Sequence, residues 1–586
     1  MQVGRSALGR TWRLRACDES LALALSQRLG LDEVVGRVLA GRGIGLDEAP
    51  DFLEPRLRSA MPDPSHLHDL DRAAARIADA VEDGQTVGVL GDYDVDGATS
   101  TALFVRYLRG LGIDSAVEIP DRIADGYGPN EAALARLAGQ GCRLVVTLDT
   151  GTTAFAPLAR AADGGLDVVV IDHHAAEAEL PRAVAVVNPN RRDQDSPLKH
   201  LAAVGMTFVV VVAVSRELRS RGFFRRRVEP DPLQWLDLVA LGTVCDVVPL
   251  SGLNRAFVRQ GLKVARANGN PGLAALAQAA GIAAITEAWQ LGFALGPRIN
   301  AGGRIGRSDL GARLLGTDDP REASGLAQRL DELNGRRQAM EREQLAVAEA
   351  AVAEAARAGE PVLVAADGRF HPGIVGILAS RLVERFHRPA FVVAVDGEGV
   401  GRGSARSVPG LDLGLAVMEA RAAGLLLRGG GHPMAAGITV EAAKLAEMAA
   451  FVGRRLAAGA GAGAAPGTPG PLELDGALSV GGVTPALALQ VERLSPFGAG
   501  NAEPSFVLAD ARPIEVRPVG ETHLSCTLTG KAGGRLRAVA FRSRGTPLAD
   551  ALLSGEPLRL AGRVKVDRWQ GREGASFQIE DAAAPA

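Results

Sequence analysis

The chain has 586 residues, of which 47% are hydrophobic and 23% are charged. This is an ordinary globular composition, which excludes a largely disordered or fibrous protein, and the length allows roughly three or four domains. The formal net charge is only -3. A chain that is basic throughout is therefore excluded, and any surface for nucleic acid must be local.

Cysteine usage and hydropathy narrow the class further. The four cysteines are far apart and form no CxxC pair, which argues against a disulfide framework or a thiolate zinc site: Cys17, Cys142, Cys245 and Cys526. No stretch approaches the ~18 apolar residues of a membrane helix, and the N-terminal arginines are not followed by an apolar run. We therefore expect no membrane association and a reducing cytoplasm.

The first half of the chain predicts an α/β domain behind a helical segment. Residues 1–60 are leucine-rich and look helical, and we expect them to form a cap on the next domain. Residues 61–316 alternate short β-branched runs with stretches rich in Ala and Leu. This alternation predicts a parallel sheet covered by helices, with strands at Thr86–Leu90, Leu144–Leu148 and Asp167–Ile171.

A long helix is predicted next, over residues 317–358, because Asp319 and Pro320 form a helix-start signal. A helix of this length would make a rigid arm to a second α/β domain, 359–457, with strands at Val362–Ala365 and Ala390–Val395. Residues 458–471 alternate Ala and Gly and then contain Pro, which is typical of a flexible linker.

Residues 472–584 predict a small all-β barrel or sandwich. Its strands are expected at Phe506–Leu508, Ser525–Leu528, Leu536–Phe541, Leu558–Val566 and Ser576–Ile579. Residues 512–572 carry twelve Lys and Arg against five Asp and Glu. This is either a well-solvated surface or a track for single-stranded nucleic acid, with Phe541, Trp569 and Phe577 as stacking platforms unless they belong to the core.

Three carboxylates follow the first predicted strand, at Asp92, Asp94 and Asp96. Like charges this close repel, so they need a cation or protons. An extended segment would place all three on one side. An Asp-rich turn is one alternative. A calcium loop of the D-x-D-x-D-G type is another, but Leu103 occupies the position of its bidentate Glu, and the loop follows a strand.

Other apolar runs end in similar groups. Asp149 follows the second strand, Asp172-His173-His174 follow the third, and Asp246 follows another apolar run. Any one Asp in such a place is more often a helix cap or a turn residue. Together they predict a site, because ligands of open α/β sheets bind at the carboxyl ends of the strands.

Carboxylates with one or two imidazoles favour Mn²⁺ or Mg²⁺ over a thiolate zinc site. There are enough carboxylates for two ions, with Asp149 as a candidate bridge. Two such metals can activate a water and stabilise a leaving oxygen. The residues therefore predict metal-assisted hydrolysis of a phosphate ester or anhydride.

These motifs, in this order, resemble the DHH phosphoesterase superfamily and, within it, the RecJ branch. The resemblance covers residues from about 50 to 580 and rests on the following strings: Asp92–Gly97, Ile119–Arg122, Asp125–Gly128, Asp172–His174, Asp246, Gly296–Arg304, His371–Ile377, Gly401–Ser407, Gly429–Gly437 and Leu494–Asn501.

The resemblance implies a DHH domain, a long connecting helix, a DHHA1 domain and a C-terminal oligonucleotide-binding (OB) barrel. It implies an exonuclease specific for single-stranded DNA, working 5′ to 3′ with Mn²⁺ or Mg²⁺ and releasing 5′-mononucleotides in recombination and repair. A single-strand-binding protein and a RecQ-type helicase are the implied partners. The matched positions imply that Asp94, Asp96, Asp149, His173 and Asp246 ligate metal, with Asp92 and His174 as further catalytic groups that either ligate metal or lie next to the ligands.

We expect the second α/β domain to face this metal edge across a cleft that admits one strand and excludes a duplex. Its glycines would allow close approach, and its cations and hydroxyls would hold phosphate oxygens. The candidates for substrate binding are Arg122, Tyr127, Arg298, Asn300, Arg304, Arg402, Ser404, Arg406, Ser407, Gly430, Gly431 and His432. For a glycine run or a lone arginine, a plain loop or surface is the alternative.

Two other functions remain open at this point. One is a phosphodiesterase for short oligonucleotides or cyclic dinucleotides, which would be expected to lack the basic β domain. The other is a non-catalytic replication scaffold of the same fold, which would be expected to lose the carboxylates.

Overall fold

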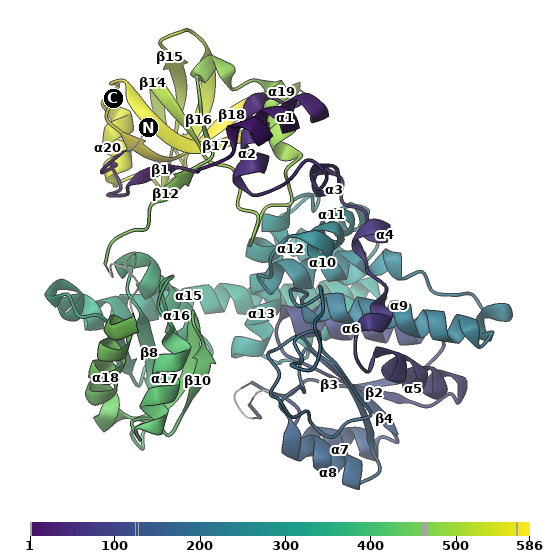
Figure 1. The fold of residues 1–586 in the computed structure, drawn as a ribbon. Coiled ribbons are helices and arrows are strands. Elements are labelled where there is room, and N and C mark those ends of the chain that lie inside the picture. The colour runs from purple at the N-terminus through teal and green to yellow at the C-terminus, as the bar shows by residue number, and fades with distance from the viewer. Residues whose placement is uncertain (1–2, 123–124, 127, 460–466, 570–571, 586) are drawn as a thin grey trace. The chain divides into compact units, whose positions relative to one another are not determined.

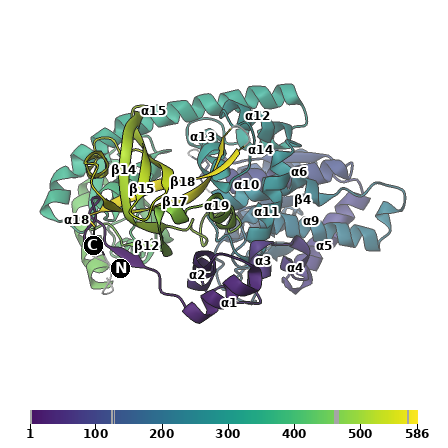
Figure 2. The same ribbon diagram turned by 90° about the horizontal axis from the view of Figure 1, so that it is seen from above.

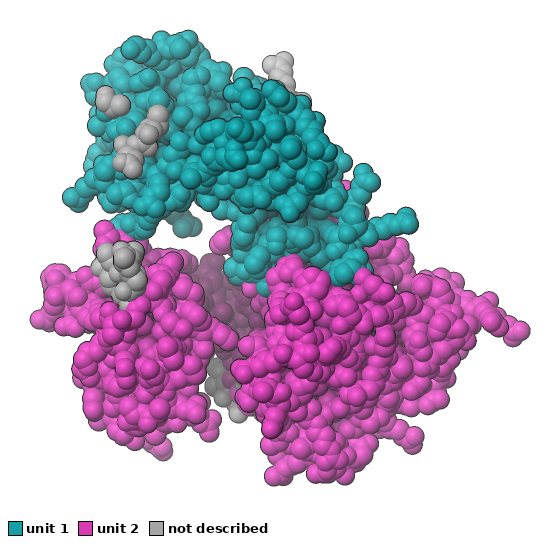
Figure 3. Space-filling view, viewed as in Figure 1, with its two compact units in different colours: residues 1–62, 247–259, 469–586 teal, residues 63–246, 260–468 magenta. Residues whose placement is uncertain are grey.

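The computed structural model describes residues 3–122, 125–126, 128–459, 467–569 and 572–585 (Figure 1). The chain forms two compact units (Figure 3). Unit 1 combines residues 1–62, 247–259 and 469–586, and unit 2 combines residues 63–246 and 260–468. Both units are therefore built from segments that are distant in the sequence.

The first part of unit 2 is a parallel sheet between helices. The strand order is β3-β2-β4-β5-β6, and every neighbouring pair is parallel. The strands are β2 (Val87–Gly91), β3 (Ser115–Glu118), β4 (Leu144–Leu148), β5 (Asp167–Ile171) and β6 (Ala185–Val187). The helices are α5 (Leu70–Glu82), α6 (Val95–Gly110), α7 (Glu131–Gly139), α8 (Phe155–Asp163), α9 (Ala203–Ser220), α10 (Leu236–Cys245), α12 (Pro271–Ala279), α13 (Gly296–Ile305) and α14 (Leu310–Gly316).

Strands β2 and β4 are buried along their whole length, and β5 along all but its first residue, which explains why the sequence shows them as continuous apolar runs. The predicted parallel α/β fold is confirmed.

Helix α15 (Pro320–Ala358) joins the two parts of unit 2 (Figure 2). Asp319 caps it by accepting from the Arg321 N–H, and Gly359 ends it in the left-handed conformation. Its 39 residues span about 59 Å at 1.5 Å per residue. The predicted long helix is therefore present.

The second part of unit 2 is a mixed sheet of order β10-β11-β9-β8-β7. Its strands are β7 (Leu363–Asp367), β8 (Ala390–Val395), β9 (Val400–Arg406), β10 (Arg428–His432) and β11 (Ala435–Glu441), and its helices are α16 (Val375–Phe386), α17 (Leu413–Ala422) and α18 (Leu445–Gly459). Only β7 and β8 run parallel. Of the predicted linker 458–471, residues 460–466 lie outside the described part of the chain.

Unit 1 contains a closed barrel. Strand β14 pairs with both β15 and β17, and the order β14-β15-β16-β18-β17 returns to β14, which is the closure of a five-stranded OB barrel. The strands are β14 (Phe506–Val519), β15 (His523–Gly530), β16 (Arg535–Ala540), β17 (Leu558–Trp569) and β18 (Arg572–Ala583), joined by β1 (Trp12–Leu14), β12 (Leu472–Leu474) and β13 (Gly476–Leu478). The helices are α1 (Glu19–Leu29), α2 (Glu33–Gly41), α3 (Ala49–Leu53), α4 (Leu57–Ala60), α19 (Pro485–Glu492) and α20 (Pro547–Leu553), with α11 (Gly252–Arg266) beginning in this unit.

The N-terminal segment corrects one prediction. Leu25, Val35 and Leu39 of residues 1–60, predicted to cap the following domain, instead share one apolar core with the barrel of unit 1. The segment also contributes strand β1, which pairs with β12. The buried Asp581 anchors the beginning of this N-terminal segment, because its carboxylate accepts hydrogen bonds from the Trp12 indole (3.1 Å) and the Ser6 hydroxyl (2.5 Å).

Two of the aromatic residues considered for stacking have opposite positions. Phe577 is fully buried in the barrel core, which excludes it as a platform, whereas Phe541 is 52% exposed. The side chain of Trp569 lies outside the described residues. No helix in the described part of the chain is long and apolar enough to span a membrane.

The packing of the N-terminus gives a first prediction. Leu25→Ala removes a fully buried side chain from the core shared with the barrel, so we expect a loss of about 2–5 kcal/mol in the stability of unit 1. Hydrogen exchange should show faster exchange in β17 and unchanged exchange in β2 and β4. Leu23→Ala, at a 46% exposed position, is the matched control. Selective loss of protection in β2 and β4 would instead restore the predicted cap.

Candidate active site

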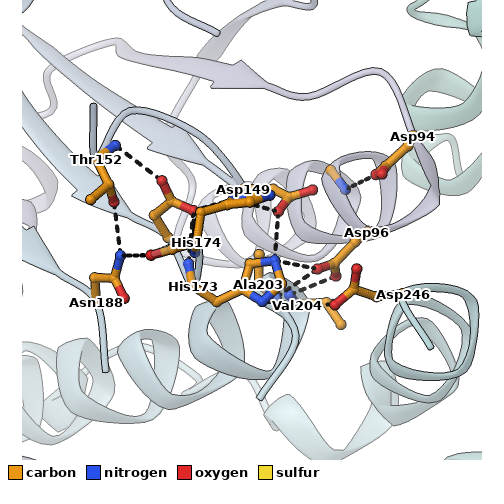
Figure 4. A network of polar contacts seen from close by, with 12 residues as sticks. Asp94, Asp96, Asp149, Thr152, His173, His174, Asn188, Ala203, Val204 and Asp246 are labelled. Atoms are coloured by element: carbon orange, nitrogen blue, oxygen red, sulfur yellow. Dashed lines mark hydrogen bonds and ion pairs between the residues drawn. The ribbon is translucent and has the colours of Figure 1, made fainter. Parts of the chain in front are cut away.

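The carboxyl edge of the first sheet gathers the acidic and imidazole groups (Figure 4). Asp92 follows β2, Asp149 follows β4, and Asp172, His173 and His174 follow β5. Asp246 comes from a different kind of element, since it directly follows helix α10. The four stretches that the sequence indicated therefore meet at one place, as open α/β sheets favour.

Asp92, Asp94 and Asp96 do not lie on one side of an extended segment as predicted. Helix α6 begins at Val95, and Asp94 is its N-cap, accepting from the Gly97 N–H at 3.1 Å. A Cβ at Gly97 would lie 2.5 Å from the Asp92 carbonyl oxygen, so glycine lets the loop fold closely over the helix start. The prediction of a common side assumed an extended segment. Because Asp94 instead caps a helix, Asp96 lies in the first helical turn and points to a different side.

Asp96 is buried against the N-terminus of α9. Its two oxygens accept from the Ala203 N–H at 2.6 Å and the Val204 N–H at 2.9 Å. These are N–H groups of the first turn, which have no partner within their own helix and favour a negative charge. The helix end therefore orients the Asp96 carboxylate (Figure 4).

Asp149 sits at a sharp turn after β4. Its φ of 63° is left-handed, and its N–H bonds the Ile171 carbonyl at 3.0 Å. The turn is tightened by the Thr147 hydroxyl, which donates to the Thr150 carbonyl at 2.9 Å. Asp149 is buried, and His173 Nε2 lies 3.3 Å from its Oδ1.

Three groups of side chains have ligand atoms close enough to hold one ion. They are Asp92, Asp94 and Asp149; Asp149, His173 and His174; and Asp96, His173 and Asp246, with all ligand atoms of a group within 4.8 Å of one another. Asp149 and His173 each belong to two groups. The arrangement thus offers overlapping sets of oxygen and imidazole donors.

Burial sets the electrostatics of this cluster. Desolvation, followed by the charges of neighbouring carboxylates, raises the pKa of Asp92, Asp96, Asp149 and Asp246 above the ordinary value. Buried acids that resist ionisation in this way need positive charge to become carboxylates together.

The donors fit divalent cations. Carboxylate oxygens and imidazole nitrogens are ligands of Mn²⁺ and Mg²⁺ sites, and buried Asp246 Oδ2 has no hydrogen-bond donor within the described part of the chain. A cation would supply the positive charge that the cluster lacks.

Asp172 acts on the two histidines; the sequence placed it in the Asp172-His173-His174 string but assigned it no role of its own. It is buried, and its Oδ1 accepts from His174 Nδ1 at 2.7 Å and from the His173 N–H at 2.7 Å. Its Oδ2 accepts from the Thr152 N–H at 3.0 Å. Burial alone would raise the pKa of Asp172, but the hydrogen bond and charge of His174 hold it well below the ordinary value.

The two histidines consequently differ in charge. Burial and the neighbouring His174 lower the pKa of His173 to about 4, so its ring is neutral at pH 7. Burial also opposes ionisation of His174, but the hydrogen bond and charge of Asp172 outweigh it and raise its pKa to about 9. His173 is therefore suited to metal ligation and His174 to holding a proton.

Two asparagines in the loop after β6 donate hydrogen bonds to the backbone carbonyls of the histidines. Asn188 Nδ2 donates to the His174 carbonyl at 2.8 Å and to the Thr152 hydroxyl at 2.9 Å. Asn190 Nδ2 donates to the His173 carbonyl at 2.6 Å. Neither asparagine carried a signal in the sequence, because each acts through the backbone of residues far along the chain.

A pocket of about 650 Å³ lies beside this cluster, between the two parts of unit 2. Tyr93 and Arg122 line it from the first part, and Arg402, Ser404 and Gly430 are among the residues that line it from the second. The Arg122 guanidinium stacks over the Tyr93 ring at 5.0 Å. Figure 3 shows unit 2 hollowed between its two lobes.

Two more arginines of the predicted set are close by. Arg304 donates to the Gly373 carbonyl at 3.0 Å, and burial, reinforced by Arg122, Arg337 and Arg406, lowers its pKa to about 10. Burial, followed by the charge of Arg122, also lowers the pKa of Arg406. Crowded cations of this kind favour a phosphate, just as the crowded acids favour a metal.

Other predicted substrate contacts have partners of a different kind. The Arg298 guanidinium is bound to Asp331 at 2.8 Å, and the Ser407 hydroxyl, which is buried, lies near the Leu411 carbonyl at 3.4 Å. Gly431 and His432 lie on β10 and are exposed, and Asn300 lies on α13. Tyr127 lies outside the described residues. Substrate binding by these residues stays a prediction.

Family models agree with this architecture. The DHH family N-terminal domain matches residues 86–243, the DHHA1 domain matches 359–458, and the RecJ OB domain matches 474–581. The single-stranded-DNA-specific exonuclease RecJ of Salmonella typhimurium is 35% identical over 583 residues, covering 98% of this chain and 99% of that protein. The chain belongs to the RecJ family.

Solved structures of that family match as well. RecJ of Thermus thermophilus in complex with Mn²⁺ superposes with a TM-score of 0.80 at 31% identity, covering 98% of this chain and 80% of that one. Its complex with Mg²⁺ gives a TM-score of 0.75 at 30% identity, covering 98% of this chain and 78% of that one. The RecJ fold predicted from the motifs is confirmed, and Mn²⁺ and Mg²⁺ are the ions that its relatives bind.

The Asp172–His174 pair gives the second prediction. Asp172→Asn removes the negative charge beside His174 Nδ1, so the pKa of His174 should fall from about 9 toward its ordinary value near 6.5. Near pH 8 the ring should be protonated in the parent protein and largely neutral in the variant. An NMR titration of the metal-free full chain measures this shift. Asp193→Asn, at an exposed residue beside His68, is the control, and an unchanged His174 titration in Asp172→Asn would contradict the assignment.

Proposed function

We propose that this protein is an exonuclease that hydrolyses single-stranded DNA from its 5′ end, with two Mn²⁺ or Mg²⁺ ions, and releases 5′-mononucleotides in recombination and repair. The observation that carries the proposal is the meeting of three potential metal-binding groups with an arginine-lined pocket in one unit. The RecJ relatives are named as single-stranded-DNA-specific exonucleases, which supports the substrate.

The proposed metal ligands are Asp94, Asp96, Asp149, His173 and Asp246, with Asp92 beside them and Asp149 as the bridging group. A pair of divalent ions supplies a water nucleophile at neutral pH and stabilises the leaving oxygen when bound. Asp96 is held for this task by the first turn of α9, and His173 presents a neutral ring.

His174 is the proposed proton carrier. Its Nδ1 proton is committed to Asp172, and its side chain is 41% exposed, unlike the side chain of His173 at 13%. We assign the second proton of the imidazolium, on Nε2, to transfer to an oxygen of the substrate. Asp172 thus acts as a positioning residue that keeps His174 charged near neutral pH.

The arginine-lined pocket is the proposed seat of the strand end. Arg122, Arg402 and Ser404 line it, and Arg304 and Arg406 add positive charge nearby. Guanidinium groups bind phosphate through paired hydrogen bonds, and the glycine at position 430 leaves room for the backbone of a ligand. In this proposal a single strand enters the pocket between the two parts of unit 2 and a duplex is excluded on steric grounds, without reading of bases.

The proposal also includes protein partners and a cellular compartment. A single-strand-binding protein and a RecQ-type helicase would supply and present the unpaired strand, and the reaction would take place in the cytoplasm. These partners follow from the family alone.

The deciding experiment is digestion of 5′-labelled and 3′-labelled single strands, and of a matched duplex, with Mn²⁺, Mg²⁺ or EDTA. We expect mononucleotides from the 5′ end of single strands with either metal and none with EDTA. Products only from very short oligonucleotides would overturn the proposal, and so would digestion that is independent of metal.

Asp149→Asn gives the third prediction. The amide cannot replace the charge of a carboxylate shared by two of the ligand groups, so kcat should fall by about three orders of magnitude or more. Mn²⁺ binding, measured by calorimetry, should weaken in parallel while the circular dichroism spectrum stays unchanged. Asp195→Asn, at a side chain that is 97% exposed, is the control. A near-normal rate in Asp149→Asn at saturating Mn²⁺ would refute the ligand assignment.

Arg402→Ala gives the fourth prediction. Because Arg402 is exposed in the pocket and holds no metal ligand, its loss should raise KM about tenfold or more and change kcat much less. The effect should be larger for a 5′-phosphorylated strand than for a 5′-hydroxyl strand. Arg369→Ala, at an exposed arginine paired with Asp367, is the control. An equal rise in KM for both strands would show that Arg402 does not bind the 5′ phosphate.

A further inference from the structure

A cluster of arginines follows the C-terminal end of α9, away from the site described above. The chain there reads Arg219, Arg221, Arg225, Arg226 and Arg227, with Phe223 and Phe224 between them. The last three arginines are exposed and follow or end a short 3₁₀ helix, η2 (Phe223–Arg225). We call residues 225–227 the arginine tip.

The acidic side chains near the tip form ion pairs with Arg219 and Arg221, the two arginines that precede the tip. Arg221 pairs with Asp79 at 2.7 Å, with Glu82 at 2.8 Å and with Glu217 at 2.8 Å. Arg219 pairs with Glu229. Within the described residues, no carboxylate forms an ion pair with Arg225, Arg226 or Arg227, so three positive charges remain for a ligand.

The aromatic rings at the tip are already engaged. Arg227 lies over the Phe223 ring at 4.4 Å, and Phe224 meets that ring edge-on, with centroids 5.4 Å apart. Binders of single-stranded nucleic acid expose aromatic faces on which unpaired bases stack. Arg227 covers the ring of Phe223, so that ring does not serve as a stacking platform and charge is the main feature that the tip offers.

Helix α9 sets the distance from the tip to the reaction. Its first turn holds Asp96, and its 18 residues span about 27 Å, which corresponds to about eight base pairs at 3.4 Å each. Figure 1 shows α9 running outward to the edge of unit 2. The tip is therefore outside the catalytic pocket, at a separation that a nucleic acid of modest length can bridge.

From these observations we infer that the arginine tip binds the phosphate backbone of duplex DNA that adjoins the single-stranded tail being digested. The inference rests on the proposed function, because it takes the substrate to be DNA. Duplex DNA is the polymer that fits, since it presents one phosphate charge per about 1.7 Å and asks for no contact to unpaired bases. Arginine is suited to the contact because its planar fork pairs with phosphate oxygens.

The test measures binding with EDTA present, so that no strand is cut. Its probes are a duplex that carries a 5′ single-stranded tail and a long single strand of the same tail sequence. Arg225→Ala, Arg226→Ala and Arg227→Ala together should weaken binding of the tailed duplex roughly tenfold or more and lower the slope of log K against log salt by about 2–3. Affinity for the long single strand should stay unchanged.

Two further variants control the charge and the site. The same positions changed to Lys keep the charge and should retain most of the affinity and salt slope. A triple Ala variant at Arg321, Arg336 and Arg342, which are exposed on α15, removes the same charge elsewhere in unit 2 and should bind as the parent does. Equal losses in the Ala and Lys variants of the tip would overturn the inference, because packing would then be the cause.

Other outcomes also decide. Unchanged binding of the tailed duplex by the triple Ala variant would overturn the inference and leave an acidic protein surface as the ligand of the tip. An equal loss with the single strand would overturn the choice of duplex. Failure of the proposed function would be seen in a different measurement: the parent protein, with its arginine tip intact, would not digest the single-stranded tail in Mn²⁺.

Discussion

Mutual repulsion of buried carboxylates is the constraint on which the site depends. Asp92, Asp96 and Asp149 are all buried at one sheet edge; Asp92 and Asp96 raise the cost of ionising Asp149, and Asp94 raises the cost of ionising Asp92 and Asp96. At Asp96 the N–H groups of the first turn of α9 offset part of this cost. A site assembled in this way is stable with protons or with cations, and the choice between them couples metal binding to pH.

The two neighbouring histidines have different roles, metal ligation for His173 and proton transfer for His174, because their side chains have different partners. His173 and His174 are neighbours in sequence, yet Asp172 takes its side-chain hydrogen bond from His174 alone. His173 stays neutral because burial, followed by the charge of His174, lowers its pKa, whereas His174 stays charged because, against the effect of burial, the hydrogen bond and charge of Asp172 raise its pKa. Arg304 and its neighbouring arginines repeat the principle with the opposite sign, since repulsion among them favours an anion.

The sequence predicted elements that are decided locally. Strands β4 and β5 have the predicted bounds because both are continuous buried runs, and α15 is marked by Asp319, Pro320 and Gly359 at its ends. What failed depends on distant partners. The leucines of residues 1–60 show that a face is buried but not what covers it, and Arg298 gives no sign in the sequence of its bond to Asp331. Asp172 was passed over as a supporting group because a carboxylate that accepts hydrogen bonds and one that binds metal are the same residue type.

The division of unit 1 into distant segments has a consequence for the order of folding. Helices α1 and α2 lie within the first 62 residues, but the strands that bury Leu25 and Val35 belong to residues 469–586. During synthesis these helices emerge from the ribosome more than 400 residues before those strands, so their apolar faces stay uncovered until the strands follow. Unit 2, with the complete carboxylate cluster, ends at residue 468 and has all of its residues available earlier. The nascent chain can therefore assemble its metal centre while its N-terminus is still without its partner.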